Sequence, residues 1–155
     1  MKRIASFEVD HTKLRPGLYL SRVDGKAGCE VSTFDIRLTA PNHEPPVDMP
    51  ALHTIEHLGA TFLRNGERKE DIVYFGPMGC RTGCYLVMFG KLSPEDVIGL
   101  VESMCEFIMR YEGDIPGATP AECGNWREQN LAEAKYYVSR YLRALRTERN
   151  TKYPA

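Results

Sequence analysis

Two histidines four residues apart, with a glutamate between them, are the feature of this sequence best suited to chemistry. They are His53 and His57, and the glutamate is Glu56. Because an α-helix has about 3.6 residues per turn, side chains at these spacings share one face. Two imidazoles there can bind one metal ion while the carboxylate carries protons, and H-x-x-E-H is the inverted zinc-protease motif. The stretch therefore predicts a metal site, with a solvated surface helix as the alternative.

A catalytic metal site also needs a third protein ligand and an open coordination position. The candidates are His11, His43, one of the five cysteines, or a distant carboxylate. Two cysteines are predicted to lie in loops, where a thiolate can be presented to a ligand. Cys80 lies in a loop rich in glycine and proline, and Cys123 precedes the last predicted helix. Spacing does not choose between these two cysteines.

Length, composition and charge indicate an ordinary globular protein. The 155 residues are 43% hydrophobic and 26% charged, and the net charge is −1. We expect a single domain over 1–155, large enough to bury a core. The balanced charge gives no electrostatic case for binding nucleic acid or an anionic membrane. No apolar run suits a signal peptide or a membrane span, so we expect a cytoplasmic protein with reduced thiols.

The elements that must position these residues are strands and helices in alternation. Alternating apolar residues predict strands at 18–23, 31–39, 71–75 and 84–89, with a turn at 24–26. Helical spacing and capping residues predict three helices, which begin after Asp48, Ser93 and Asn130 and end near Gly66, Tyr111 and Arg146. Because the hairpins are tight, we expect an α+β fold, a single-domain two-layer sandwich with a mostly antiparallel sheet and helices packed on one side.

Five blocks of the sequence resemble the S-ribosylhomocysteine lyase (LuxS) family, in family order and at family spacing. The blocks are Ser6-Phe7 with 9–13, then 34–37 with Pro41-Asn42, 52–58, 77–83 and 122–124. The family cleaves the thioether of S-ribosylhomocysteine to homocysteine and 4,5-dihydroxy-2,3-pentanedione, the precursor of the quorum-sensing signal autoinducer-2. The resemblance therefore implies a metal-dependent carbon–sulfur lyase that serves autoinducer synthesis, recycling of a methyl-cycle product, or both.

The resemblance also implies roles for individual residues. It makes His53, His57 and Cys123 the metal ligands, with Fe²⁺ as the working metal, one per subunit, and Zn²⁺ or Co²⁺ able to replace it. Glu56 and Cys80 become the acid–base pair. A homodimer with active sites at the subunit interface is implied as well. The positions that line the substrate site in relatives are Ser6, His11 and Arg37.

The reaction explains why such residues are needed. The carbon–sulfur bond is remote from the aldehyde of the sugar, so the carbonyl must migrate from the first carbon to the third before β-elimination. A divalent ion with an open site can stabilise each enediolate, and two nearby groups must move protons. A thiol with a reference pKa of about 8.5 needs a nearby cation to ionise at neutral pH. Arg37 is our candidate for that cation beside Cys80, and Arg81 is the alternative.

Two positions depart from many relatives. Cys84 stands where an aromatic residue is common, and we expect it to be packed and inert, with metal binding or a disulfide to Cys80 as alternatives. Tyr74-Phe75-Gly76 stands where the strand before Pro77 often carries an acidic residue. Such an acid would pair with the amino group of the substrate, so the way this chain holds the homocysteine end stays open.

Two other functions fit parts of the pattern. A small metallopeptidase would use Glu56 to activate a metal-bound water, but it would need another third ligand, such as a distant glutamate, and would leave Cys80 without a role. A metal-stabilised binding module would close the site with a fourth protein ligand, either Cys80 or Cys84.

Overall fold

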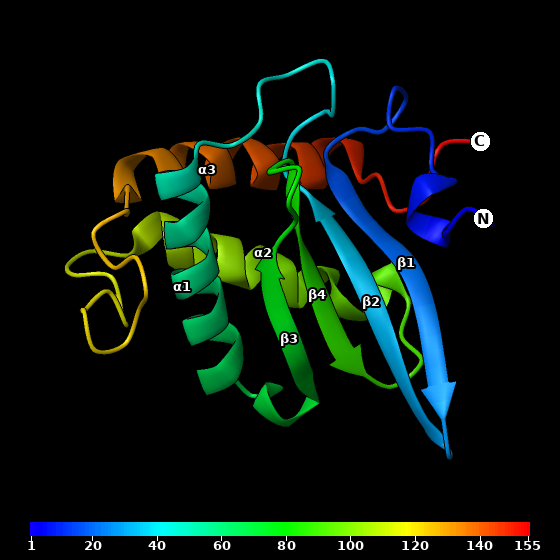
Figure 1. Cartoon of the computed structure of the whole chain (residues 1–155), viewed down its shortest axis with the longest axis horizontal. Coiled ribbons are helices and arrows are strands. Elements are labelled where there is room, and N and C mark those ends of the chain that lie inside the picture. The colour runs from blue at the N-terminus through cyan, green and yellow to red at the C-terminus, as the bar shows by residue number, and fades with distance from the viewer.

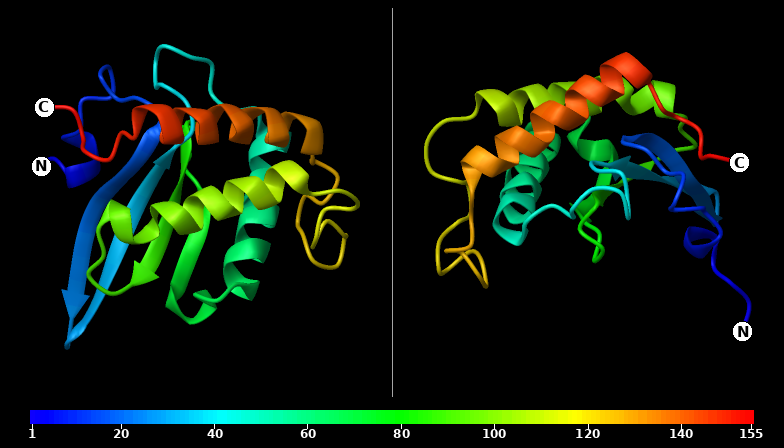
Figure 2. Two further views of the ribbon diagram at one scale, coloured as in Figure 1. Left: turned by 180° about the vertical axis from the view of Figure 1, so that it is seen from behind. Right: turned by 90° about the horizontal axis from the view of Figure 1, so that it is seen from above.

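A four-stranded antiparallel sheet and three helices make up the computed structural model, which describes all 155 residues. The strands, in sheet order, are β1 (Gly17–Lys26), β2 (Cys29–Arg37), β4 (Gly83–Phe89) and β3 (Ile72–Pro77). The helices are α1 (Met49–Asn65), α2 (Pro94–Arg110) and α3 (Leu131–Glu148), which lie on one side of the sheet (Figures 1 and 2). The predicted α+β class is therefore confirmed. None of the helices combines the length and apolar content that crossing a membrane requires.

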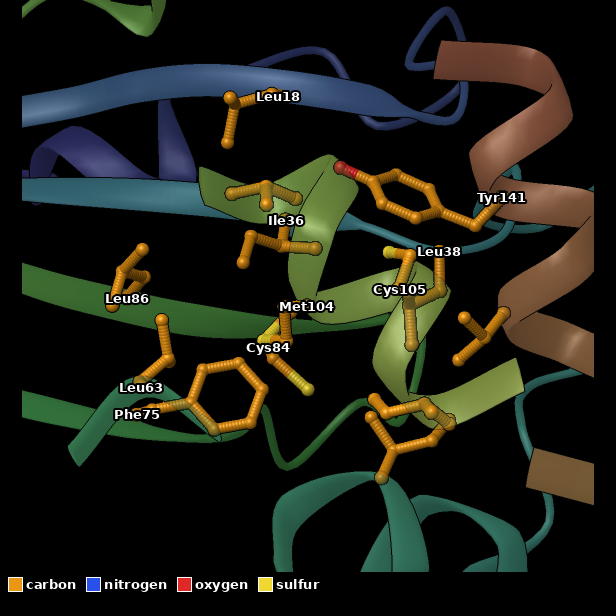
Figure 3. Packing of buried hydrophobic residues seen from close by; sticks show 14 of the residues in the cluster. Leu18, Ile36, Leu38, Leu63, Phe75, Cys84, Leu86, Met104, Cys105 and Tyr141 are labelled. Carbon is orange, nitrogen blue, oxygen red and sulfur yellow. The ribbon is translucent and has the colours of Figure 1, made fainter. Parts of the chain in front are cut away.

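The core lies between the sheet and the helices. On β2 and β4, alternate residues face it, and the register pairs Phe34 with Leu86 and Ile36 with Cys84. Figure 3 shows Cys84 and Cys105 among the apolar side chains of this core. Both cysteines are at most 1% exposed. The prediction that Cys84 is packed is thus confirmed, because its sulfur faces the core rather than Cys80 or a metal ligand.

Capping explains where the helices begin. The backbone N–H of Ser93 donates to Asp96 Oδ2 at 2.7 Å, and the side chain of Asn130 accepts from the backbone N–H of Glu133 at 3.0 Å. Each bond satisfies a polar group near a helix N-terminus that would otherwise lack a partner. Asp48 precedes α1 as predicted, but its side chain forms no capping hydrogen bond. The last helix runs to Glu148, slightly beyond its predicted end.

The first hairpin differs from the prediction at its turn. Lys26 pairs directly with Cys29, so the turn lies at Ala27–Gly28 and not at 24–26. Both turn residues have positive φ, 54° for Ala27 and 80° for Gly28. Two-residue turns of this kind match the twist of antiparallel strands, which is why the pairing continues to the tip.

The face of the sheet opposite the core carries polar and aromatic residues. The register places Tyr19 on β1 and Tyr85 on β4 on either side of Asp35. None of α1, α2 and α3 covers this face. The N-terminal segment lies against part of it, where Ala5 and Ser6 line a cavity with Thr33 and Tyr85, and the C-terminal tail lies near β1 (Figure 1). Arg37 follows on the same face and is only 3% exposed, so it is buried rather than facing solvent.

Candidate functional site

The three predicted metal ligands come together at one end of the molecule. His53 and His57 project from the first half of α1, and Cys123 lies in the loop that joins α2 to α3. His53 Nε2 is 3.0 Å from His57 Nε2 and 3.4 Å from Cys123 Sγ. The three ligand atoms all lie within 4.8 Å of one another. This spacing suits a single ion.

Hydrogen bonds at Nδ1 of each ring set the orientation of the two imidazoles. His53 Nδ1 is 2.9 Å from the carbonyl oxygen of Glu128, and His57 Nδ1 is 2.7 Å from that of Pro116. A carbonyl only accepts, so each Nδ1 carries the donated hydrogen and each ring directs its Nε2 at the other. Two Nε2 atoms that face each other in this way can bind one cation between them. The donor set of two nitrogens and one sulfur suits Fe²⁺, Zn²⁺ or Co²⁺ better than Mg²⁺ or Ca²⁺.

The loops that supply these carbonyls are themselves held in place. Buried Thr54 donates to Gln129 Oε1 at 2.8 Å and accepts from the backbone N–H of Asn130 at 2.9 Å. These two bonds tie the segment around Glu128 to α1. On the other side, Gly117 has a φ of 72°, and a Cβ there would lie 3.3 Å from His57 Nδ1. These supporting residues were not predicted, although the threonine inside the histidine motif and the glycine after Pro116 are visible in the sequence.

Glu56 shares the helix face of the two histidines and is partly exposed. It also lies close enough to the core to affect Cys84: burial raises the pKa of that thiol, and the negative charge of Glu56 raises it further. Cys84 is therefore a neutral, packed thiol. Since neither Cys84 nor Cys80 belongs to the cluster of three ligands, nothing in the chain closes the site with a fourth cysteine.

A separate cavity of about 400 Å³ holds the second group of predicted residues. Cys80, in the loop between β3 and β4, opens into it together with Arg37. Arg37 Nη1 is 3.8 Å from Cys80 Sγ. The structure thus brings together four of the five predicted site residues that are not metal ligands, and the fifth, Glu56, does not line this cavity. The complete lining is Ser6, Phe7, His11, Arg37, Tyr74, Pro77, Met78, Gly79, Cys80 and Tyr85.

The surroundings of Cys80 favour its thiolate. Burial raises the pKa of Cys80, but hydrogen bonds with Thr82 and the positive charge of Arg37 outweigh burial and leave that pKa below its ordinary value. Thr82 Oγ1 lies 3.2 Å from Cys80 Sγ and accepts from Arg37 Nη1 at 2.7 Å. Arg81 instead donates toward the carbonyl of Val47. Arg37 is therefore the cation beside the thiol, as hypothesised, and Arg81 is not.

On β3, Tyr74-Phe75-Gly76 stands where many relatives carry an acidic residue, and Tyr74 and Gly76 are in close contact there. A side chain at Gly76 would collide with the Tyr74 ring and hydroxyl, so the ring of Tyr74 folds over this glycine. Tyr74 lies at the wall of the cavity that contains Cys80. A tyrosine, and not an acidic residue, therefore lines the cavity from this strand.

We call His53, His57 and Cys123 together the metal cluster and the cavity at Cys80 the thiol cavity. The two do not merge within one chain. None of the three predicted metal ligands lines the cavity at Cys80. The loop that carries Cys123 lies beyond α1, on the side away from the sheet, whereas the N-terminal segment with Ser6 and His11 lies past β1 (Figures 1 and 2). A single chain thus holds the two groups of candidate residues apart.

The sequence as a whole matches one family of known proteins. A sequence model of S-ribosylhomocysteinase (LuxS) matches residues 4–152. An S-ribosylhomocysteine lyase of Borreliella burgdorferi is 52% identical over 157 residues, covering 99% of this chain and 100% of its own length. Proteins with the same name from Finegoldia magna and Desulfotalea psychrophila are 48% and 46% identical, over 94% and 100% of this chain and 92% and 100% of their own lengths. The chain belongs to the S-ribosylhomocysteinase (LuxS) family.

Proposed function

We propose that this carbon–sulfur lyase cleaves the thioether of S-ribosylhomocysteine to homocysteine and 4,5-dihydroxy-2,3-pentanedione in the cytoplasm. The observation that carries the proposal is the pair of histidines whose Nε2 lone pairs converge with a thiol, in a chain that belongs to this family. Such a site leaves a coordination position for substrate, which a lyase acting on a carbonyl sugar needs.

His53, His57 and Cys123 would hold the metal ion, and the donor set supports Fe²⁺, with Zn²⁺ or Co²⁺ able to replace it. The ion would supply a Lewis acid that polarises the sugar carbonyl and its neighbouring hydroxyl. The carbonyls of Glu128 and Pro116 keep each imidazole in the tautomer that such binding requires.

Cys80 and Glu56 would move the protons. The thiolate of Cys80 takes a proton from the carbon next to the carbonyl, and Arg37 with Thr82 stabilises the charge that this base needs. Glu56, on the face of α1 that carries the histidines, serves the later transfers and the elimination of the thiolate of homocysteine. Ser6 and His11 line the cavity that would receive the substrate.

The enzyme would be a homodimer in which each active site uses both subunits. The metal ligands and the thiol cavity are separate in one chain, and none of α1, α2 and α3 covers the polar face of the sheet. A second copy would bring the metal cluster of one subunit to the thiol cavity of the other.

Mixed dimers test this arrangement. His57→Ala and Cys80→Ala each inactivate a homodimer, but a mixed dimer of the two variants would contain one intact site and one doubly altered site. We expect co-expressed variants to recover activity that neither has alone. If all groups came from one chain, both sites of the mixed dimer would stay broken and no activity would return.

The lyase activity itself is tested by release of homocysteine from S-ribosylhomocysteine with anaerobically purified, Fe²⁺-loaded protein. We expect turnover in the wild type and none in Cys80→Ala, which should remain folded and bind metal. A folded, metal-replete wild type that released no thiol would overturn the proposal.

A further inference from the structure

A buried ion pair lies behind the reactive thiol. Arg37 Nη2 donates to Asp35 Oδ2 at 2.5 Å, and both side chains are 3% exposed. Burial removes both charges from water, so their remaining hydrogen bonds determine how firmly the pair is held. Asp35 Oδ1 and Arg37 Nε have no partner. The carboxylate therefore accepts from only two side chains, Arg37 and Tyr153, both at Oδ2.

Tyr153 belongs to the C-terminal tail, residues 149–155, which returns along β1 after α3. Arg149 turns the chain with a φ of 50°. The carbonyl of Asn150 accepts from the backbone N–H of Leu18 at 2.9 Å, and its side-chain amide donates to the carbonyl of Pro16 at 3.0 Å. A Cβ at Gly17 would lie 2.5 Å from the Asn150 oxygen, so glycine is needed for this close approach. The tail is thus attached to the first strand.

This attachment holds Tyr153 over the buried pair. Its ring stacks on Tyr19, with 4.8 Å between the centroids and 9° between the planes. Its hydroxyl donates to Asp35 Oδ2 at 3.0 Å. Burial, together with the negative charge of Asp35, raises the pKa of Tyr153, so the hydroxyl keeps its hydrogen.

The pair connects directly to Cys80. Arg37 Nη1 donates to Thr82 Oγ1 at 2.7 Å and lies 3.8 Å from Cys80 Sγ. Because Thr82 accepts from Arg37, its own hydrogen is free to point at the sulfur, 3.2 Å away. If Arg37 moved toward Asp35, its hydrogen bond to Thr82 and its contact with the sulfur of Cys80 would both weaken.

We propose that the C-terminal tail is a positioning element for Cys80, with Tyr153 holding Asp35 so that Asp35 holds Arg37 against Thr82 and the thiol. The tail does not touch the substrate cavity, and Tyr153 acts only through the residues between. The importance of the tail for catalysis rests on the proposed function, in which Cys80 is a base. The effect of the tail on the Cys80 thiol does not depend on that function.

The test replaces Tyr153 with phenylalanine, which keeps the stacked ring and removes only the hydroxyl. Asp35 then keeps Arg37 as its only side-chain donor and loses the hydrogen bond that stabilises its negative charge. Arg37 is drawn toward Asp35, and the less stabilised carboxylate lies nearer in effect to the sulfur, so both changes disfavour the thiolate of Cys80. A second cavity, of about 330 Å³, also reaches Cys80 and is lined by His11 and Glu44. The other titratable groups facing Cys80 across the two cavities are thus His11, Glu44, Tyr74 and Tyr85, and the variant leaves them in place.

The readout is the pH dependence of iodoacetamide alkylation, followed by mass spectrometry of the Cys80 peptide. We expect Tyr153→Phe to move the midpoint to higher pH and to lower the thiolate fraction at neutral pH about threefold, the effect of one modest hydrogen bond. The matched control is Tyr136→Phe on the exposed face of α3, which should change nothing.

Two further measurements separate the possible outcomes. The melting temperature and Co²⁺ binding of Tyr153→Phe report on folding and on the metal cluster. A variant that is less stable but has an unchanged alkylation midpoint would overturn the proposal, because the tail would then be structural only. If the midpoint shifts as expected while the wild type fails to cleave S-ribosylhomocysteine, the positioning role stands and the proposed reaction fails.

Discussion

Two of the three predicted metal ligands lie one helical turn apart on α1, whereas the groups around Cys80 come from the N-terminal segment, three strands and the loop between β3 and β4. In the metal cluster, the pitch of a helix sets the distance between the histidines. At the thiol, sheet register and a buried ion pair place Arg37. The first site is therefore largely local in sequence, and the second depends on long-range contacts.

The two regions also hold their polar groups differently. Backbone carbonyls satisfy the outer nitrogens of the metal cluster, and backbone positions are difficult to change by mutation. The thiol cavity relies on side chains, and its ion pair leaves two polar atoms without a partner. We expect single side-chain changes to shift the pKa of Cys80 by small amounts. The metal affinity should change mainly when a ligand or the loop that carries it is lost.

Removing the cysteine of each region should give the largest contrast. Cys123→Ala deletes a proposed metal ligand, so we expect loss of bound metal and of turnover. Cys80→Ala removes the proposed base and should abolish turnover while one metal per subunit remains. Elemental analysis of the purified proteins, together with homocysteine release, checks both. A Cys80→Ala protein lacking metal would mean that the two regions are one site within the chain.

Glu56→Gln separates proton transfer from metal binding. The amide keeps the shape of the side chain but cannot carry a proton, so turnover should fall about 10²- to 10⁴-fold, the usual contribution of a general acid or base. Metal content and melting temperature should match the wild type. A metal-free Glu56→Gln protein would instead make this residue a ligand.

Thr54→Val should weaken the metal cluster without affecting the thiol. Valine cannot bind Gln129 or the Asn130 N–H, so the segment that orients His53 loosens. We expect metal affinity to fall about tenfold, as for other residues that orient ligands. Competition of Co²⁺-loaded protein with a chelator measures this, and Thr54→Ser should restore the affinity. Alkylation of Cys80 should be the same in all three proteins.

Thr82→Val makes the converse change in the thiol cavity. Thr82 lowers the pKa of Cys80, so its loss should raise that pKa and reduce the thiolate present at a given pH about tenfold. The acid limb of the rate–pH profile should move to higher pH, while Co²⁺ binding stays unchanged. Thr82→Ser keeps the hydroxyl and should behave as wild type. An unmoved profile would show that Arg37 acts without this hydroxyl.

Tyr74→Phe should give the smallest effect, at the cavity wall. If its hydroxyl binds the homocysteine end of the substrate, KM should rise about threefold with kcat unchanged, the loss of one hydrogen bond. A substrate analogue without the amino group should bind both proteins alike. An equal KM for the natural substrate would remove Tyr74 from substrate recognition.

Local patterns predicted the elements well, and long-range contacts account for what they missed. The capping residues Ser93 and Asn130 marked the starts of α2 and α3. The turn at Ala27–Gly28 was misplaced because Asp24-Gly25 is the stronger turn signal, whereas continued pairing with β2 carries the strand past it. Arg37 could be taken for a solvent-facing charge because its burial depends on Tyr153 and Asp35.

The sequence by itself determined the metal motif, the α+β class and the family, because helix pitch, strand alternation and motif order are properties of neighbouring residues. Only the tertiary structure decided which tautomers the two histidines adopt, which arginine lies beside Cys80, and that Tyr153 supports that arginine. Each of these depends on a hydrogen bond between residues far apart in the chain, which no local spacing encodes. The same reason explains why no local pattern showed that the predicted metal ligands and the cavity at Cys80 lie apart within a single chain.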